Sequence, residues 1–246
     1  VGSHMADLIF EKFPESKIYG VKRWHLSNLD NLQHLLKNII LVDCDLTDPV
    51  STYDLINLTK PDIVFHFAAE SFVSPSWKNP HRYMQVNYNG TVNLLEAIRR
   101  NSPETVIHIP GSGEEYGDIK IEDLPISTKT LINPVNPYAV SKVAQDLISK
   151  VYFDSYGTKV IRTRGFNHEG PRRLYHFGLP WYAFQICRIK KKIQEPLIKT
   201  GHRLDKRNFT HVKDMCNAYL LSVQNCEFGE LYFCLLYTSD AADEHS

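Results

Sequence analysis

The sequence has no excess of charge of either sign, because 28 lysine and arginine residues balance 28 aspartate and glutamate residues. This balance argues against a nucleic-acid-binding or membrane-surface protein, which would carry a basic patch. The sequence also lacks a signal-peptide pattern and any apolar run long enough to cross a bilayer. Its five cysteines show neither CxxC nor disulfide-framework spacing. We therefore expect a reduced, soluble, cytoplasmic protein, and we assign no metal site.

Apolar residues are plentiful enough for a substantial core, since they make up 43% of the 246 residues. Runs typical of buried strands occur at 18–22, 39–43, 63–67, 105–110 and 159–164. Segments expected to be helical occur at 5–13, 80–100 and 137–156. Strands that alternate with helices imply parallel βαβ units, so we expect an α/β protein with a doubly wound parallel sheet.

The helix expected at 137–156 begins with a tyrosine and a lysine four residues apart, Tyr138 and Lys142. Residues at this spacing share a helix face. An ammonium close to a phenol favours the phenolate, so we expect the pKa of Tyr138 to lie below its usual value of about 10. Taken alone, the pair also fits an ordinary amphipathic helix with a surface contact. The apolar residues of this helix fall on one stripe: Val140, Val143, Ala144, Leu147, Ile148 and Val151.

The strand at 105–110 leads into Gly111–Gly117, and ligands bind at the carboxyl ends of parallel strands. Ser112, Tyr138 and Lys142 together resemble the catalytic set of the extended short-chain dehydrogenase/reductase family. The resemblance implies a Rossmann-like fold and a nicotinamide cofactor. His66, at the end of another strand, is expected to be packed in the core.

Both ends of the sequence need interpretation. Gly2–Ile9 continues the family's GxxGFxGSHLADLL pattern, although Gly-Ser-His-Met is also a common remnant of expression tags. We interpret it as native, with Gly2 as the third fingerprint glycine, which lets the first helix pack closely on the sheet. The first strand and first two glycines would then be missing. Residues 234–246 resemble an adapter-derived tail, which we exclude from function.

These interpretations give three regions. Residues 1–166 are expected to form the NAD(P)-binding Rossmann domain without its first strand. Residues 167–233 are expected to form a small, incomplete substrate-binding region whose helix returns to that domain. Because a central strand would be missing, we expect weak or no activity from the chain in this form.

The resemblance also implies which residues bind the cofactor. Arg23, after the second strand, would accommodate a 2′-phosphate, which favours NADP, with NAD as the alternative. Asp45 is either beside the adenine or a loop cap, while Asp48 is expected to cap a helix. The implied cofactor-binding residues are Gly2, Arg23, Asp45, Leu46, Ala68, Ala69, Ser71, Tyr138, Lys142, His168 and Arg173.

Two further segments resemble GDP-mannose 4,6-dehydratases. Asn167–Arg173 resembles their NHExPRR motif, and Gly201–Phe209 is similar to GNLxAKRDW. The resemblance implies that Arg207 binds the diphosphate of a nucleotide sugar, with Asn167 as a second contact, since arginine donates paired hydrogen bonds to phosphate. Arg172 and Arg173 could instead be surface charges.

Glu114 would be the second proton-transfer group that a dehydratase needs. The implied reaction converts GDP-mannose to GDP-4-keto-6-deoxy-mannose. Tyr138 would take the C4 hydroxyl proton, Ser112 would hold the carbonyl, and Glu114 would act at C5 and C6. Lys142 would lower the pKa of Tyr138 and bind the nicotinamide ribose. Family resemblance also suggests a homo-oligomer.

Other functions remain open. The loop Gly111–Gly117 and Ser141 look more like GDP-6-deoxy-4-keto-mannose reductases, and a nucleotide-sugar 4-epimerase is a further alternative. A different class is a non-catalytic dinucleotide-binding protein. The presence of Ser112, Tyr138 and Lys142 argues against that class.

Overall fold

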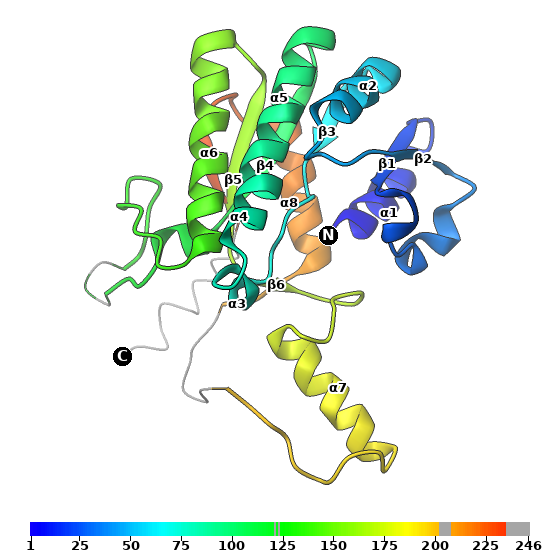
Figure 1. Ribbon diagram of the computed structural model, residues 1–246, viewed down its shortest axis with the longest axis vertical. Helices are drawn as coiled ribbons and strands as arrows, with labels where there is room; N and C mark the ends of the chain where they lie inside the picture. The colour runs from blue at the N-terminus through cyan, green and yellow to red at the C-terminus, as the bar shows by residue number, and fades with distance from the viewer. Residues whose placement is uncertain (121, 123, 202–207, 235–246) are drawn as a thin grey trace.

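Parallel strands alternate with helices along the chain (Figure 1). The computed structural model describes residues 1–120, 122, 124–201 and 208–234. The strands are β1 (Ile18–Lys22), β2 (Ile39–Asp43), β3 (Ile63–Phe65), β4 (Val106–Ser112), β5 (Val160–Gly165), β6 (His168–Glu169), β7 (Thr210–His211) and β8 (Leu231–Cys234). The α-helices are α1 (Gly2–Lys12), α2 (Pro49–Thr59), α3 (Val73–Ser76), α4 (Pro80–Tyr83), α5 (Gly90–Asn101), α6 (Pro137–Tyr156), α7 (Gly178–Lys190) and α8 (Val212–Asn225).

The strands form a Rossmann-like parallel sheet in two parts. The central part has the order β3-β4-β5-β8, while β1 pairs with β2 in a separate two-stranded sheet. Every pairing is parallel, and β6 and β7 form a further short pair. The expected α/β fold class is confirmed. Within the described residues no strand joins β1 to β3, and the interpretation that a first strand is missing there stays a prediction.

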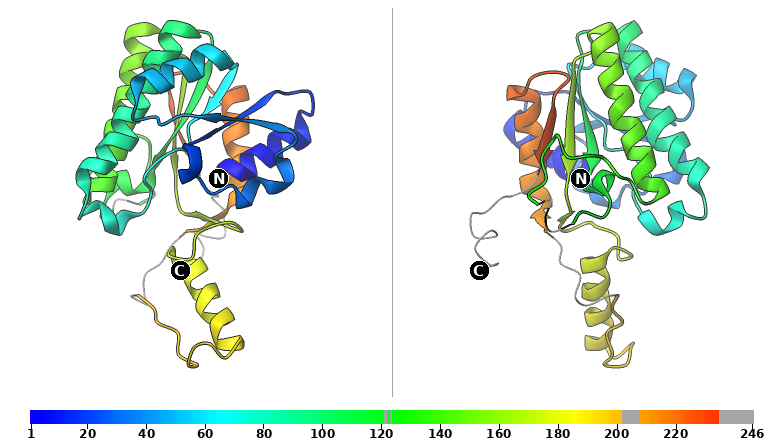
Figure 2. Two further views of the ribbon diagram at one scale, coloured as in Figure 1. Left: turned by 45° about the vertical axis from the view of Figure 1, so that its right-hand side comes forward. Right: turned by 90° about the vertical axis from the view of Figure 1, so that its left-hand side faces the viewer.

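Helices cover both faces of the central sheet (Figure 2). Helices α5 and α6 lie on one face, where Leu95 and Ile98 pack against Ile107 and Ile109 of β4. Helix α8 lies on the other face and packs against α1, with Met5 and Met215 in a shared apolar cluster. The carboxyl ends of β4 and β5 are therefore held between two packed layers.

Helix α6 has the range that the sequence predicts, but half of its apolar stripe is turned outward, while Ile148 packs against the core. Val140, Leu147 and Val151 are 46%, 51% and 49% exposed. The buried face is mostly polar and consists of Ala139, Ser141, Lys142, Gln145, Asp146, Ser149 and Tyr152. This orientation differs from the usual surface helix, whose apolar face packs on the core. It is possible because the buried polar groups find hydrogen-bond partners on α5, β4 and β5.

The ends of the helices follow ordinary capping chemistry. Asp48 caps α2, as expected, by accepting hydrogen bonds from the backbone N–H groups of Val50 and Ser51, each at 3.2 Å. Asn136 caps α6 by accepting from the Ala139 N–H at 2.8 Å. At the other end of α6, Gly157 has φ of 68°, which glycine adopts without strain.

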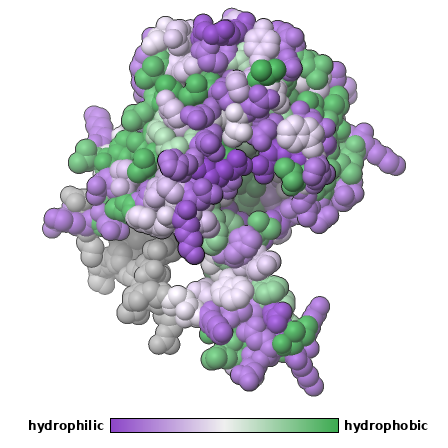
Figure 3. Space-filling view, viewed as in Figure 1, coloured by the Kyte–Doolittle hydropathy of each residue, from purple (hydrophilic) through white to green (hydrophobic). Residues whose placement is uncertain are grey.

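Helix α7 projects from the body of the molecule (Figures 1 and 3). Polar and apolar side chains are mixed over this projection (Figure 3). In the part of the chain that the structure describes, no helix combines the length and apolar character needed to cross a membrane.

Two buried histidines should make the fold sensitive to acid. His66 and His108 are 4% and 0% exposed, and each bonds through Nε2 to a threonine hydroxyl, Thr91 and Thr163 respectively, at 2.9 Å. Burial, with Lys142 adding, lowers both pKa values to about 3, whereas an unfolded histidine has a pKa of about 6.5. Below pH 6.5 the unfolded chain therefore binds protons that the folded chain does not, and stability falls as the pH falls toward 3.

The measurement is the free energy of urea unfolding between pH 7 and pH 4. His66→Gln with His108→Gln should flatten its dependence on pH. The exposed His25→Gln is the matched control and should leave the dependence unchanged. An equally steep loss of stability in the double variant would contradict the assignment.

Candidate active site

The carboxyl end of β4 is held in a fixed shape by Glu115. The Glu115 carboxylate accepts a hydrogen bond from the Ser112 N–H at 2.7 Å, and the Ser112 hydroxyl accepts one from the Glu114 N–H at 3.2 Å. A Cβ atom on Gly111 would lie 2.4 Å from Glu115 Oε1 and 3.0 Å from the Thr163 carbonyl oxygen. Only glycine therefore leaves room for the carboxylate at this turn.

The Tyr138 phenol lies beside Ser112, but its pKa shifts in the direction opposite to the expectation. Burial raises the pKa of Tyr138 to about 12, and the charges of Glu114 and Glu115 act in the same direction. A hydrogen bond with Ser112 lowers it only in part. The expected lowering by Lys142 was wrong for this arrangement, because the lysine ammonium points elsewhere.

The Lys142 ammonium lies in the interior beneath β4. It donates to the Pro110 carbonyl oxygen at 2.5 Å and to the side-chain oxygen of Gln145. The residue is 4% exposed, and this burial lowers its pKa to about 8, while Glu115 and Asp146 act to raise it. Lys142 is thus a buried cation that depends on nearby carboxylates to stay charged.

Glu114 is exposed beside the start of α6. Its Oε2 accepts a hydrogen bond from Nδ2 of Asn136 at 3.0 Å, and its charge is close enough to raise the pKa of Tyr138. Ser112 and Glu114, from β4 and the turn after it, are therefore brought together with Tyr138 from α6. The arrangement places two proton-transfer groups, a phenol and a carboxylate, at the same end of the sheet.

Asn87 ties the end of β3 to α6. Its Oδ1 accepts from the Glu70 N–H at 2.8 Å, and its Nδ2 donates to the Glu70 carbonyl at 3.0 Å and to the Ser141 hydroxyl at 2.9 Å. Asn87 is fully buried in the π-helical turn Met84–Asn89. The neighbouring Ala68 and Ser71 are exposed. The small residues after β3 are thus held in place with a free surface, as a ligand would require.

A cavity of about 100 Å³ lies at the N-terminal end of α1. Val1 and Ser3 line it together with His168 and Arg173, which come from the Asn167–Arg173 segment. The unpaired N–H groups of a helix N-terminus and an arginine suit an anionic group such as a diphosphate. The structure therefore brings two of the predicted residues, His168 and Arg173, together beside the first turn of α1, with Glu169 also in the lining; Gly2 does not line the cavity.

The segment around this cavity is docked on α1. His4 Nε2 is 3.0 Å from the Pro171 carbonyl oxygen, and Arg172 donates to Asp7 at 2.7 Å. The role of Gly2 in close helix packing stays a prediction, because the strand on which α1 would pack through it is the one expected to be missing. A Cβ on Gly2 would meet no atom within 4 Å, because the residue lies exposed in the first turn of α1.

Arg23 and Asp45 lie near each other after the paired strands β1 and β2. Although burial acts to raise the pKa of Asp45, hydrogen bonds from the Thr47 N–H and hydroxyl, at 2.9 and 2.8 Å, keep it below its usual value. The charges of Arg23 and Arg82 add to this lowering. Asp45 therefore does act as a loop cap. Arg82, which the sequence interpretation did not include, adds a second arginine to this region.

Other predicted residues are not part of this cluster. Leu46 packs near Gly90, where an added Cβ would lie 3.3 Å from the leucine Cβ. Asn167 is exposed after β5, and its carbonyl oxygen accepts from the Thr210 N–H at 2.9 Å. Arg207 lies outside the described residues.

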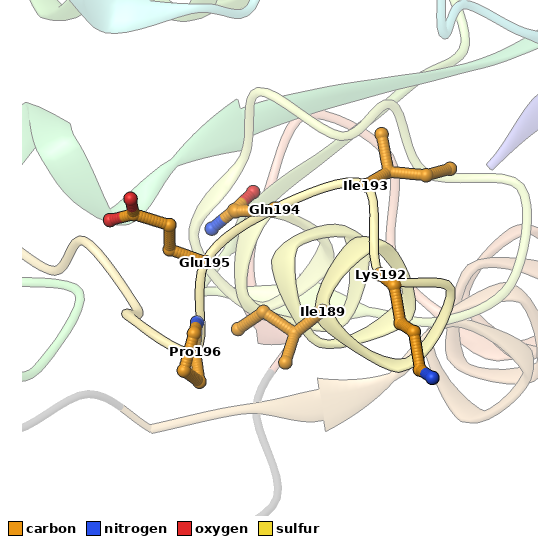
Figure 4. Close-up of a pocket in the computed structure, with 6 residues that line it drawn as sticks. All are labelled: Ile189, Lys192, Ile193, Gln194, Glu195 and Pro196. Atoms are coloured by element: carbon orange, nitrogen blue, oxygen red, sulfur yellow. The ribbon is translucent and has the colours of Figure 1, made fainter.

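A surface hollow at the C-terminal end of α7 contains none of the predicted residues (Figure 4). Ile189 comes from the helix, and the Lys192 side chain points away from that of Glu195 (Figure 4). The lining consists of Ile189, Lys192, Ile193, Gln194, Glu195 and Pro196. Among the described residues, no group of three or more histidine, cysteine or acidic side chains could hold a metal ion.

Sequence reasoning missed a group of buried charges beneath the site. Arg162 and Arg164 lie on β5 and contact Asp146 of α6. The available signal was their spacing, because residues two apart in a strand share a face, and two arginines in an apolar strand require acidic partners.

The comparisons with known proteins agree with this geometry. A family profile described as GDP-mannose 4,6 dehydratase matches residues 1–238. GDP-6-deoxy-D-mannose reductase from Pseudomonas aeruginosa is 35% identical over 189 residues, which are 76% of this chain and 62% of that protein. GDP-mannose 4,6-dehydratase from Vibrio cholerae is 31% identical over 239 residues, which are 92% of this chain and 62% of that protein.

A solved structure of RMD from Pseudomonas aeruginosa complexed with NADPH is also similar. It is 31% identical, with a TM-score of 0.77, and the match covers 89% of this chain and 78% of that one. The chain spans less than two thirds of the length of the two curated relatives above.

Proposed function

This chain belongs to the GDP-mannose 4,6-dehydratase family, within the extended short-chain dehydrogenases/reductases, and from that premise we propose that it catalyses the dehydration of GDP-mannose to GDP-4-keto-6-deoxy-mannose. The proposal assigns it to the lyases. Its relatives are dehydratases and reductases of nucleotide sugars, and the coarser assignment to that group follows from family membership.

The nicotinamide cofactor follows from the same comparison and from the cavity at α1. The cofactor is NAD(P), as in the similar structure that binds NADPH, and we propose NADP as the form used because Arg23 and Arg82 lie together near Asp45. When bound, it would supply the hydride chemistry, in which a hydride leaves C4 of the sugar and one returns to C6. His168 and Arg173 would hold its diphosphate at the N-terminus of α1.

The protein's own residues would handle the protons. Tyr138, as the phenolate, would accept the C4 hydroxyl proton and would later deliver it to C5 when the hydride reaches C6, and Ser112 would hold the developing carbonyl oxygen. Glu114 would remove the C5 proton, which the C4 ketone makes acidic, and would return it to the departing C6 hydroxyl as water. Asn136 keeps the Glu114 carboxylate beside Tyr138 through its 3.0 Å hydrogen bond. Asn167 and Arg207 are the proposed contacts to the nucleotide sugar.

One observation carries the dehydratase assignment, namely the carboxylate of Glu114 beside the phenol of Tyr138. Oxidation and reduction at a single carbon need one proton-transfer group, whereas elimination of water needs a second one for the neighbouring C–H bond. Glu114 is an exposed acid in the position to act as that group.

The reductase alternative has its own support. The chain is 35% identical to the Pseudomonas aeruginosa reductase over 189 residues, and the loop Gly111–Gly117 resembles the loops of such reductases. A reductase would consume NADPH in proportion to product, whereas a dehydratase regenerates its cofactor. The two functions therefore differ in stoichiometry as well as in substrate.

Incubation of the protein, completed to the length of its relatives, with GDP-mannose and a catalytic amount of NADP, followed by mass spectrometry of the sugar nucleotide, tests the proposal. Loss of one water without net formation of NADPH is the expected result. Oxidation of NADPH only when GDP-4-keto-6-deoxy-mannose is supplied would move the protein to the reductases.

Glu114→Gln should abolish most of the dehydration, by about 10²–10⁴-fold, because the amide cannot accept the C5 proton. Binding of NADPH, followed by its fluorescence, should stay unchanged. Glu122→Gln is a control that removes an acid from the same loop region. Dehydration at the normal rate in the Glu114 variant would remove the main support for the assignment.

The outward stripe of α6 supports the further proposal of a homo-oligomer. Val140, Leu147 and Val151 expose apolar surface along one helix, which a second copy of the chain could cover. Light scattering should give a mass above that of one chain, and Leu147→Glu should lower it. A monomeric mass for the unmodified protein at all concentrations would contradict this proposal.

A further inference from the structure

Five charged side chains are buried together beneath the active site. They belong to Glu115, Lys142, Asp146, Arg162 and Arg164, and none of these residues is more than 8% exposed as a whole. The two carboxylates balance the two guanidinium groups, so Lys142 is the additional charge. Buried charges are unfavourable unless they are paired and hydrogen-bonded, which makes this arrangement costly to assemble without a role.

The pairing is specific. Arg164 donates from Nε to Glu115 at 2.7 Å and from Nη2 to Asp146 at 2.8 Å, and Arg162 donates to the second Asp146 oxygen at 2.9 Å. Arg164 also donates to the Tyr116 hydroxyl at 2.5 Å. The network links the turn after β4, helix α6 and strand β5.

Glu115 is ionised in this arrangement. One of its oxygens accepts from the Ser112 N–H and the other from the Arg164 guanidinium. A protonated carboxyl group would place a hydrogen where only donors face it. Although burial raises the pKa of Glu115, the Arg164 charge opposes that shift.

We propose that Glu115 is a positioning residue, which fixes the Ser112 backbone and, together with Asp146, keeps the Lys142 ammonium charged in its buried site. The role rests on the proposed function, in which Ser112 holds the carbonyl oxygen; Lys142 belongs to the set that resembles the family's catalytic residues. Glu115 is placed to do both, because its Oε1 accepts from the Ser112 N–H and lies against Gly111, next to the Pro110 carbonyl that binds the Lys142 ammonium.

Carboxylates, histidines and arginines surround the Lys142 ammonium. Glu115 and Asp146 favour the charged ammonium, whereas burial opposes it. The cation in turn lowers the pKa values of His66 and His108, which face it from β3 and β4. Both histidines are neutral near pH 8, so they do not compete with the carboxylates there. Arg162 and Arg164 stay charged throughout this range.

The first experiment measures the titration of the Lys142 ammonium directly and does not require turnover. In protein labelled with ¹³C at lysine Cε, the Lys142 resonance, assigned with Lys142→Met, is followed by NMR from pH 6 to pH 11. Glu115→Gln and Asp146→Asn should each move the titration midpoint to lower pH, by about one unit. The exposed Glu104→Gln is the matched control and should leave it in place. An unchanged midpoint in both buried variants would overturn the charge role.

The second experiment separates the effect of the Glu115 charge from the effect of its side-chain length. Glu115→Asp keeps the charge but is one methylene too short to hold the Ser112 N–H and Arg164 together. It should lower kcat about tenfold at every pH while leaving the Lys142 midpoint near that of the unmodified protein. Full kcat in Glu115→Asp would overturn the positioning of Ser112.

Failure of the proposed function would look different. The unmodified protein would then not act on GDP-mannose, while the NMR midpoints would still shift as described. The fluorescence of bound NADPH shows whether each variant remains folded. The charge role is then judged from whichever of Glu115→Gln and Asp146→Asn binds NADPH.

Discussion

Tyr138→Phe is expected to lower turnover by about 10²–10⁴-fold, because the phenol is the proposed acceptor of the C4 hydroxyl proton. The ring itself would stay in place, since it packs edge-on against Tyr83 with centroids 6.3 Å apart. Single-turnover rates with GDP-mannose and NADP measure the effect on chemistry rather than on product release.

The same helix offers a matched control. Tyr156 is 57% exposed at the far end of α6, so Tyr156→Phe should leave the rate unchanged. NADPH binding should be similar in both variants, because neither change removes a charge. A Tyr138→Phe protein that retains more than a tenth of the normal rate would remove the phenol from the mechanism.

Arg164→Met should destabilise the fold by about 3–5 kcal/mol, because it leaves two buried carboxylates without their shared partner. The Arg164 side chain is 3% exposed, and those of Glu115 and Asp146 are 0% and 4% exposed. The free energy of urea unfolding measures the loss. Adding Glu115→Gln to Arg164→Met should recover part of the stability, because it removes one of the unpaired charges.

An exposed pair provides the comparison. The Arg100 side chain is 62% exposed in its ion pair with Glu96, so Arg100→Met should cost less than about 1 kcal/mol. Equal losses in the two variants would mean that burial does not determine the strength of the Arg164 contacts.

Much of the fold could be predicted because residues typical of caps and turns mark the ends of the apolar segments. Strands β1 and β2 and helix α6 have the predicted ranges. Asn136 and Gly157 mark the two ends of α6 as a cap and a left-handed turn. The helix expected at 80–100 is instead divided by the π-helical turn Met84–Asn89, because periodicity does not reveal one wider turn.

The sequence indicated that Ser112, Glu114 and Tyr138 lie together, but it did not indicate their electrostatics. Spacing places Tyr138 and Lys142 on one helix, yet it does not say where a long lysine side chain ends. The Pro110 carbonyl and Gln145 bind that ammonium. Adjacent glutamates are equally ambiguous, since Glu114 is exposed and Glu115 is fully buried. Only the fold shows which of the two meets an arginine.

The inverted polarity of α6 has a consequence for anyone who redesigns this protein. A design method that rewards apolar residues on buried positions would replace Ser141, Gln145 and Ser149, or would rotate the helix by half a turn. Either change would discard hydrogen bonds that hold Asn87, Thr91 and Lys142 in their places. Core redesign should therefore treat the inner face of α6 as part of the active site and confine hydrophobic substitutions to α5 and β4.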